Sequence, residues 1–214
     1  MHSVKIAGIT VAVLLAAGIV AMVRQGRLRV ADTSTYEPEH MKDFTKPDPA
    51  LPATHETAIL AGGCFWGMEE IIRKIPGVLK TTVGYSGGKT ADPTYEDVCT
   101  GATGHAEAIQ VVFDPARLSY EALLDYFFRL HDPTTPNRQH NDVGTQYRSA
   151  IFCAGEEQKQ AAERVKARWD KSGKFNRPIT TEITAATKFY PAEEYHQKYL
   201  VKHPGGYTCH VLRD

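Results

Sequence analysis

The chain has 214 residues, with 25 basic residues against 25 acidic ones, 42% hydrophobic residues and four cysteines. This composition fits one compact domain with a modest extension, and it excludes collagen, coiled coils, multi-pass membrane proteins and disordered chains. Residues 1–30 hold four basic residues and no acidic one, so the rest is mildly acidic and poorly suited to binding nucleic acid through phosphates. The cysteines are too few for a disulfide scaffold, and no Cys-x-x-Cys or His-x-x-x-His pair marks a metal site.

An uncharged apolar run, Ile6–Val23, dominates the N-terminus, with Lys5 before it and three arginines soon after it. As a helix it would reach about 27 Å, slightly less than the roughly 30 Å hydrocarbon core of a bilayer. We therefore expect residues 1–30 to be a signal peptide or membrane anchor, cleaved or retained, and residues 31–56, with four prolines, to be a linker. The positive-inside tendency favours a cytoplasmic domain and an export signal favours the opposite side; we expect an envelope protein facing outward, on the periplasmic side.

From residue 57 onward, apolar periodicity alternates between strand and helix. Period-two alternation and short apolar runs predict strands over 57–61, 78–85, 105–113, 147–153 and 179–185. Helical spacing predicts helices over 65–75, 118–130, 156–171 and 192–202. The order β-α-β-β-α-β of the first six elements predicts an α+β two-layer sandwich of the ferredoxin-like kind, with a mixed sheet, helices on one face and a coiled C-terminal tail. The folded domain is expected to span residues 57–214.

Cys64 lies between the first strand and the first helix, in the segment GGCFWG. Free backbone amides and the positive end of a helix lower the pKa of a thiol, so we expect Cys64 to be a thiolate nucleophile. The glycines on both sides leave the backbone open to a substrate, and Phe65 and Trp66 offer an aromatic wall beside the sulfur. The alternative is a buried structural cysteine among core aromatics.

Cys209 lies five residues from the C-terminus, among glycines, in a tail with too little apolar content to be held rigidly. A mobile thiol opposite a reactive one indicates a disulfide relay; the alternative is an incidental exposed cysteine. Cys153 lies on an expected buried strand and Cys99 in a short polar loop. We expect both to be structural.

Glu107 lies in the strand HAEAIQVVF, where alternation places it on the same face as Ile109 and Val111. If that face is the core side, burial raises the pKa of the carboxyl and suits it to general-acid chemistry. The opposite assignment turns Ala106 and Ala108 inward and leaves Glu107 in water. The pattern alone favours neither.

Two polar stretches, PTYEDV and NDVGTQYRS, contribute Tyr95, Asp142 and Tyr147 as hydrogen-bonding groups for a polar ligand, or as ordinary turn and half-buried residues. With them stand GCFWG at 63–67, GHAEA at 104–108 and GYTCH at 206–210. These five motifs, in the order in which they follow one another along the chain, resemble those of the peptide methionine sulfoxide reductase A family. The resemblance covers residues 58–212.

The resemblance implies reduction of methionine S-sulfoxide, free or in oxidised proteins, to methionine. It implies that Cys64 attacks the sulfoxide sulfur while Glu107 gives a proton to the sulfoxide oxygen. It further implies two groups of substrate-binding residues, polar ones that hold the oxygen and aromatic ones that enclose the methyl group: Tyr95, Asp142 and Tyr147 for the first, Phe65 and Trp66 for the second. An apolar pocket for the methyl beside polar groups for the oxygen accepts one epimer.

The resemblance also implies how the enzyme is recycled. The sulfenic acid at Cys64 condenses with Cys209 to a disulfide, which thioredoxin or an equivalent dithiol protein reduces, with no metal, flavin or nucleotide cofactor. Some family members carry a second recycling cysteine further along the tail, whereas this chain has only Cys209 there. We therefore expect a one-step relay in a monomer that contacts the membrane only through its N-terminal segment.

Two other functions stay open at this point. One is a cysteine hydrolase in which Cys64 works with an imidazole base, from His105, His196 or His210. The other is a membrane-tethered module that binds oxidised peptides without turning them over.

Overall fold

The computed structural model describes residues 51–214. The predicted signal or anchor segment, residues 1–30, and most of the predicted linker, residues 31–56, lie outside this range and stay predictions. Within residues 51–214, no helix has both the length and the apolar character needed to cross a membrane. The first strand begins at Glu56, one residue before its predicted start.

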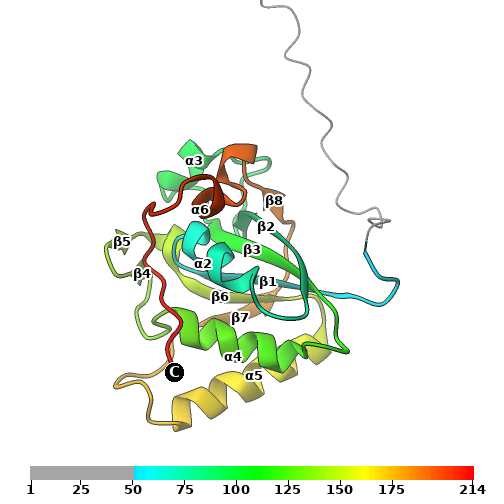
Figure 1. Ribbon diagram of the computed structural model, residues 1–214. Helices are drawn as coiled ribbons and strands as arrows, with labels where there is room; N and C mark the ends of the chain where they lie inside the picture. Colours follow the sequence, from blue (N-terminus) through cyan, green and yellow to red (C-terminus); the bar gives the residue numbers. More distant parts are fainter. Residues whose placement is uncertain (1–50) are drawn as a thin grey trace, which may run out of the picture. The chain divides into compact units, whose positions relative to one another are not determined.

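A six-stranded mixed sheet forms the centre of the domain, in the order β7-β6-β1-β3-β2-β8 (Figure 1). Its strands are β1 (Glu56–Gly62), β2 (Val78–Ser86), β3 (Ala106–Phe113), β6 (Ser149–Cys153), β7 (Glu182–Ala185) and β8 (Tyr190–Pro191). Neighbouring strands are antiparallel except β6 and β7, which are parallel. The long strands of one βαβ half alternate with those of the other, which confirms the ferredoxin-like α+β prediction.

Three helices, α2 (Phe65–Ile72), α4 (Tyr120–Leu130) and α5 (Glu156–Lys171), contribute to one large apolar core against the sheet. Shorter elements surround the ends of the strands: α3 (Tyr95–Cys99), the hairpin β4 (Arg138–Gln139) and β5 (Asp142–Val143), the 3-10 turns η1 (Thr145–Tyr147) and η2 (Glu194–His196), and α6 (Tyr199–Lys202). Because the long helices follow the predicted periodicity, helices on one face of the sheet are confirmed.

Strand β3 shows which of the two predicted faces is the core side. Ile109 and Val111 belong to the large core, whereas Ala106 and Ala108 face a smaller apolar cluster on the other side of the sheet. Glu107 shares the face of Ile109 and is only 2% exposed. The carboxyl is therefore buried against the helical layer.

The predicted helix over 192–202 is broken in the structure, and that prediction is wrong. Gln197 turns its side-chain amide to strand β2, accepting from the backbone amide of Val83 and donating to its carbonyl. Lys198 follows with φ of +52°, and its amide donates to the buried carboxylate of Glu69. These tertiary hydrogen bonds outweigh the helical preference of the segment. The predicted loop around Cys99 is also wrong, because Cys99 ends helix α3.

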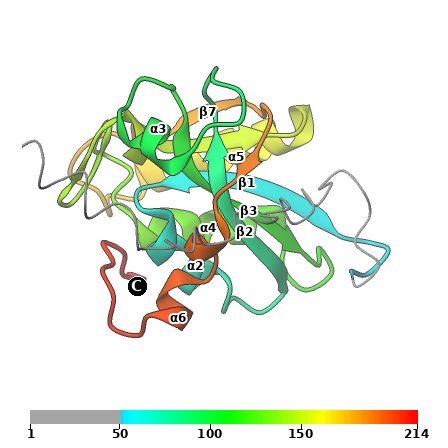
Figure 2. The same cartoon turned by 90° about the horizontal axis from the view of Figure 1, so that it is seen from above.

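The C-terminal segment, residues 207–214, has no regular secondary structure but is docked on the domain. Figure 2 shows it with α6 on the side of the sheet that carries α2. Near its end, the amide of Arg213 donates to the carbonyl of Arg129 in α4, and the guanidinium of Arg129 donates to the carbonyl of Arg213. The expectation of a tail too polar to be held in place is wrong, because backbone hydrogen bonds, which leave no apolar signature in the sequence, hold it.

Candidate active site

Cys64 stands at the N-terminal end of α2, directly after β1 and a two-glycine turn. Gly63 has φ of +104°, which disfavours other residues, and a Cβ there would lie 2.7 Å from the Cβ of Gln139. The turn therefore holds Cys64 at the helix start, as the sequence predicts. The side chain is only 6% exposed.

The electrostatic prediction for Cys64 is wrong in sign. Burial raises the pKa of its thiol above the ordinary value, and the charge of Glu107 adds to this rise. The backbone amide of Trp66, in the first turn of α2, lowers the pKa but does not compensate for the lost hydration. Desolvation outweighs the helix terminus here, so the resting side chain is a neutral thiol.

Glu107 lies next to Cys64 and accepts a hydrogen bond of 3.0 Å from the backbone amide of Phe65. Burial raises the pKa of its carboxyl to about 8, and the charge of Asp142 acts in the same direction, while the Phe65 amide opposes both. The carboxyl is therefore mostly protonated at neutral pH. In that state it carries no charge that would oppose ionisation of Cys64.

The three predicted polar residues gather around this pair from separate elements. Tyr95 begins α3, where its amide donates to a carboxylate oxygen of Glu193 over 2.9 Å. Tyr147 ends η1, and Asp142 lies in β5. Burial raises the pKa of both phenols, and the charge of Glu107 contributes to the rise in each, so both phenols are donors at neutral pH.

The two predicted aromatic residues have different surroundings. Phe65 is fully buried in the core, while Trp66 is half-buried and stacks on Tyr199 with ring centroids 3.9 Å apart. The indole N–H of Trp66 donates to Nδ1 of His196 over 3.0 Å. The structure thus places Trp66, more than Phe65, where a ligand has access.

Sequence reasoning missed Glu193, and it considered His196 only as a hydrolytic base and not as a support of this site. Glu193 accepts from the phenol of Tyr85 as well as from the amide of Tyr95, and His196 packs on Tyr95 with centroids 4.5 Å apart. Glu193 and His196 both come from one run, AEEYHQKYL, whose sequence predicts a helix. Its polar and aromatic density, too high for an ordinary solvent-facing helix, was the available signal.

Cys209 is buried beside Cys64, with 8% of its surface exposed. Its sulfur is within reach of the backbone amide of Cys64, and burial raises the pKa of its thiol to about 12. Tyr207, two residues earlier, donates its phenol hydrogen to Asp142 over 3.0 Å. The four cysteines are all unpaired, so the tail is docked with its thiol reduced.

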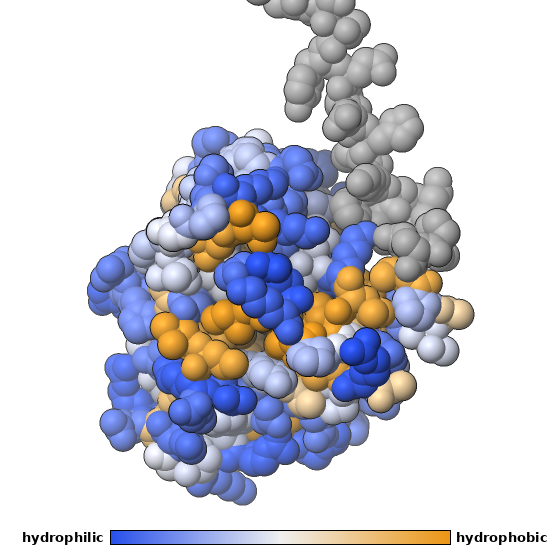
Figure 3. Space-filling model, viewed as in Figure 1, coloured by the Kyte–Doolittle hydropathy of each residue, from blue (hydrophilic) through white to orange (hydrophobic). Residues whose placement is uncertain are grey.

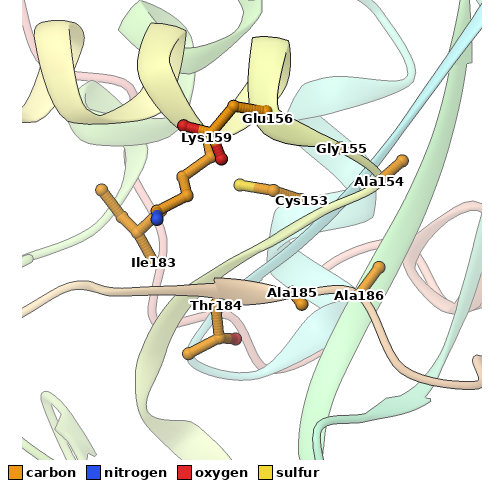
Figure 4. A pocket seen from close by; sticks show the side chains of 9 residues that line it. All are labelled: Cys153, Ala154, Gly155, Glu156, Lys159, Ile183, Thr184, Ala185 and Ala186. Carbon is orange, nitrogen blue, oxygen red and sulfur yellow. The ribbon is translucent and has the colours of Figure 1, made fainter.

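Cys153 lies at the far end of β6 from this site. It lines a pocket with the first turn of α5 and with β7, where its sulfur points toward the side chain of Lys159 (Figure 4). Strand β6 pairs Ser149 with Gly62 beside Cys64, whereas Cys153 lies beyond the opposite end of that pairing. The pocket is therefore separate from the cluster around Cys64 and Glu107.

Comparison with known proteins shows the family of the chain. The sequence model of the family described as "Peptide methionine sulfoxide reductase" matches residues 56–214. The chain belongs to the peptide methionine sulfoxide reductase family. It is 56% identical to peptide methionine sulfoxide reductase MsrA of Methanoculleus marisnigri over 71% of this chain and 92% of that one. It is 49% identical to the protein of the same name from Methanosarcina acetivorans, over 88% and 97% of the two chains. The enzyme accordingly carries out thiol-dependent reduction of methionine sulfoxide.

Several solved structures are similar to this one. Mxr1 from Saccharomyces cerevisiae in its reduced form is 40% identical, with a TM-score of 0.73 over 79% of this chain and 96% of that one. Methionine sulfoxide reductase A of Corynebacterium diphtheriae is 42% identical, with a TM-score of 0.69 over 73% and 79%. Mxr1 in complex with Trx2 is 30% identical, with a TM-score of 0.54 over 80% and 97%.

Proposed function

We propose that the enzyme reduces the S-epimer of methionine sulfoxide, with Cys64 as the nucleophile and Glu107 as the proton donor. One observation carries the proposal: a buried thiol lies at a helix start beside a carboxyl whose pKa, about 8, keeps it protonated at neutral pH. A protonated acid and a sulfur nucleophile in one water-poor site are what sulfoxide reduction needs. Both groups rest uncharged, so the apolar surroundings do not oppose them.

The chemical step balances within this pair. Glu107 gives its proton to the sulfoxide oxygen as the sulfur of Cys64 bonds to the sulfoxide sulfur, and the proton of the Cys64 thiol returns to Glu107. The oxygen then passes to Cys64: the substrate S–O bond breaks and a Cys64 S–OH bond forms. The bond between the two sulfurs breaks as this happens, methionine leaves after gaining two electrons, and Cys64 is left as a sulfenic acid. Because the thiol is not ionised beforehand, its proton moves as the sulfoxide oxygen becomes basic.

Substrate orientation follows from the two kinds of surface next to Cys64. The phenols of Tyr95 and Tyr147 are hydrogen-bond donors for the sulfoxide oxygen, and Asp142 lies near them as an acceptor for water. Trp66, backed by Phe65, supplies the apolar contact for the methyl group. A sulfoxide of the opposite configuration would exchange oxygen and methyl, which leaves the phenols without an acceptor.

Recycling is proposed to pass through a disulfide between Cys64 and Cys209, reduced by thioredoxin or an equivalent dithiol protein. The buried position of Cys209 beside Cys64 supports the first half, and the solved complex of Mxr1 with Trx2 supports the second. Apolar residues gather on the same face, over α6 and the tail, where Val201, Val211 and Leu212 are exposed (Figure 3). Such a surface suits a protein partner. Both sulfurs are buried, so the tail must undock from the domain before a reductant can reach them.

We further propose that residues 1–30 direct the enzyme to the cell envelope and that residues 31–56 link this segment to the catalytic domain. The uncharged run Ile6–Val23 supports this, because it has the length and composition of a signal or anchor segment. Membrane fractionation and protease treatment of intact cells test it. Full-length enzyme in the soluble cytoplasmic fraction would contradict it.

None of the three candidate imidazoles of the hydrolase alternative, all within the described residues, is hydrogen-bonded to Cys64. Nδ1 of His105 accepts from the amide of Gly88 and its Nε2 donates to the carbonyl of Thr90, while Nδ1 of His196 accepts from the indole of Trp66. His210 bonds to the carbonyl of Gly62 and to Cys209, not to Cys64. A thiol with a raised pKa and no imidazole partner is a poor hydrolytic nucleophile.

Cysteine variants test the proposal with dabsylated methionine sulfoxide as substrate. Cys64→Ser is expected to form no methionine with any reductant. Cys209→Ser is expected to form one equivalent per chain, then to stall with thioredoxin while retaining some turnover with dithiothreitol. Turnover by Cys64→Ser contradicts the nucleophile, and normal cycling of Cys209→Ser with thioredoxin contradicts the relay. If the wild-type enzyme forms no methionine and Cys64→Ser binds the ligand with the same affinity as the wild type, the binding module is supported instead.

A further inference from the structure

His210, the residue after Cys209, packs against the glycines around Cys64. The ring of His210 is buried, and a Cβ on Gly67 would lie 2.6 Å from its Nδ1. A Cβ on Gly63 would lie 3.3 Å from its Cε1. These glycines therefore leave room for the imidazole of the tail, rather than for a substrate as the sequence indicated.

Hydrogen bonds define the protonation state of this ring. Nε2 lies 2.8 Å from the carbonyl oxygen of Gly62, and Nδ1 lies 3.4 Å from the sulfur of Cys209. A carbonyl only accepts, so Nε2 carries the hydrogen. Burial lowers the pKa of His210 to about 4, so the ring is neutral and Nδ1 holds a lone pair. The thiol of Cys209 donates to that lone pair.

We propose that His210 is the catalytic base of the recycling step, taking the thiol proton of Cys209 at Nδ1 as Cys209 attacks the sulfenic acid on Cys64. The inference rests on the proposed Cys64–Cys209 relay and adds a residue to it. Cys209 needs such a base because burial raises the pKa of its thiol to about 12, which leaves almost no thiolate at neutral pH. The fixed bond to Gly62 keeps the accepting nitrogen pointed at the sulfur.

Other charged groups face this ring and define the competing assignment. Asp142 raises the pKa of both Cys209 and His210, whereas the charges of His140 and Arg213 lower the pKa of His210. Asp142 is the rival proton acceptor, because its carboxylate also interacts with the Cys209 thiol. One oxygen of Asp142 accepts from Tyr207 and the other is buried without a hydrogen-bond partner among the described residues, whereas Nδ1 of His210 lies within hydrogen-bonding distance of the Cys209 sulfur.

The S–S bond between Cys209 and Cys64 forms, and the S–O bond of the sulfenic acid breaks. The Cys209 proton goes to His210, and the departing hydroxide takes the proton of Glu107 and leaves as water. Cys209 is oxidised by one electron equivalent and Cys64 is reduced by one. The imidazolium, disfavoured by burial, returns its proton through solvent to Glu107, so one water is the net product.

The test is a rapid-quench single turnover of full-length, fully reduced enzyme with excess methionine sulfoxide. Methionine release reports the Cys64 step, and alkylation of residual thiols followed by mass spectrometry reports the Cys64–Cys209 disulfide. In His210→Gln, the side-chain amide still reaches the Gly62 carbonyl but offers no lone pair like that of Nδ1. We expect its disulfide step to slow by about 10²- to 10⁴-fold and to become proportional to hydroxide concentration, unlike that of the wild type.

Controls separate this inference from the relay on which it rests. His55→Gln changes an exposed histidine that bonds only near itself, and it should match the wild type in both steps. If the wild type itself forms no Cys64–Cys209 disulfide, the relay fails and His210 with it. If the wild type forms the disulfide and His210→Gln forms it equally fast, or slower without hydroxide dependence, the relay stands and His210 is not the base.

Discussion

Substituting Gly67 by alanine tests whether the docked tail matters for recycling. Gly67 lies inside α2, and an added methyl would meet the side chains of Thr208 and His210, the latter at 2.6 Å from Nδ1. Ordinary contacts start near 3.4 Å. The methyl and the seated tail therefore cannot coexist without a shift of the tail.

The effect of Gly67→Ala depends on two free-energy terms, the helix preference of alanine and the steric overlap with the docked tail. Alanine stabilises a helix interior by about 0.5–1 kcal/mol relative to glycine, while overpacking costs about 1–3 kcal/mol. The methyl of Gly67→Ala faces the tail and not the sheet, so α2 gains while the docked tail loses. The equilibrium constant between docked and undocked tail should fall roughly 5- to 150-fold, because each 1.4 kcal/mol is tenfold in an equilibrium constant.

Three measurements give the outcome for Gly67→Ala. The melting temperature should change little, the methionine burst should remain one equivalent per chain, and disulfide formation after the burst should slow by up to that factor. Gly155→Ala is the matched control, because a Cβ there meets nothing within 4 Å and φ is −175°. A Gly67→Ala enzyme that forms the Cys64–Cys209 disulfide at the wild-type rate would refute the reasoning.

Three further predictions concern other positions. Glu107→Gln should slow methionine formation by about 10²- to 10⁴-fold. The wild-type rate should fall as pH rises through about 8, because Glu107, with its raised pKa, loses its proton there. This fall should be absent from the pH–rate profile of Glu107→Gln. A fall that persists in the variant assigns it to another group. Trp66→Ala should raise KM more than it lowers kcat, because it removes apolar contact and not an acid; the opposite pattern in steady-state kinetics would argue against a binding role. Cys153→Ala, at the far end of β6, should cycle with thioredoxin as the wild type does, and a stalled variant would place Cys153 in the relay.

The sequence predicts the sheet and the long helices well, because their apolar periods are set by the core. Helix α5 has the predicted bounds, and β3 begins one residue late. Glu107 was ambiguous because both of its strand's faces are apolar: one packs on the helices and the other on a small alanine-rich cluster. Only the three-dimensional fold shows which face receives Glu107.

The sequence could not predict the electrostatics or the tail, because both depend on contacts between distant segments. The helix start at Cys64 correctly predicts an amide that lowers the thiol pKa. Burial has the larger effect and raises this pKa, and the charges of Glu107 and Cys209, both far along the chain, add to the rise. The tail looks free because its composition is polar, yet Gly67 and the carbonyl of Gly62 hold His210 in place. Hydrogen bonds to backbone groups leave no periodic signal.

The central claim is that the oxygen of the substrate passes to the sulfur of Cys64. The direct measurement uses Cys209→Ser enzyme, which cannot form the disulfide, and methionine sulfoxide carrying a heavy oxygen isotope. After one turnover, mass spectrometry of the peptide that contains Cys64 should show the mass of one heavy oxygen atom. Methionine release with an unmodified Cys64 peptide, or with the heavy oxygen on another residue, would contradict the account.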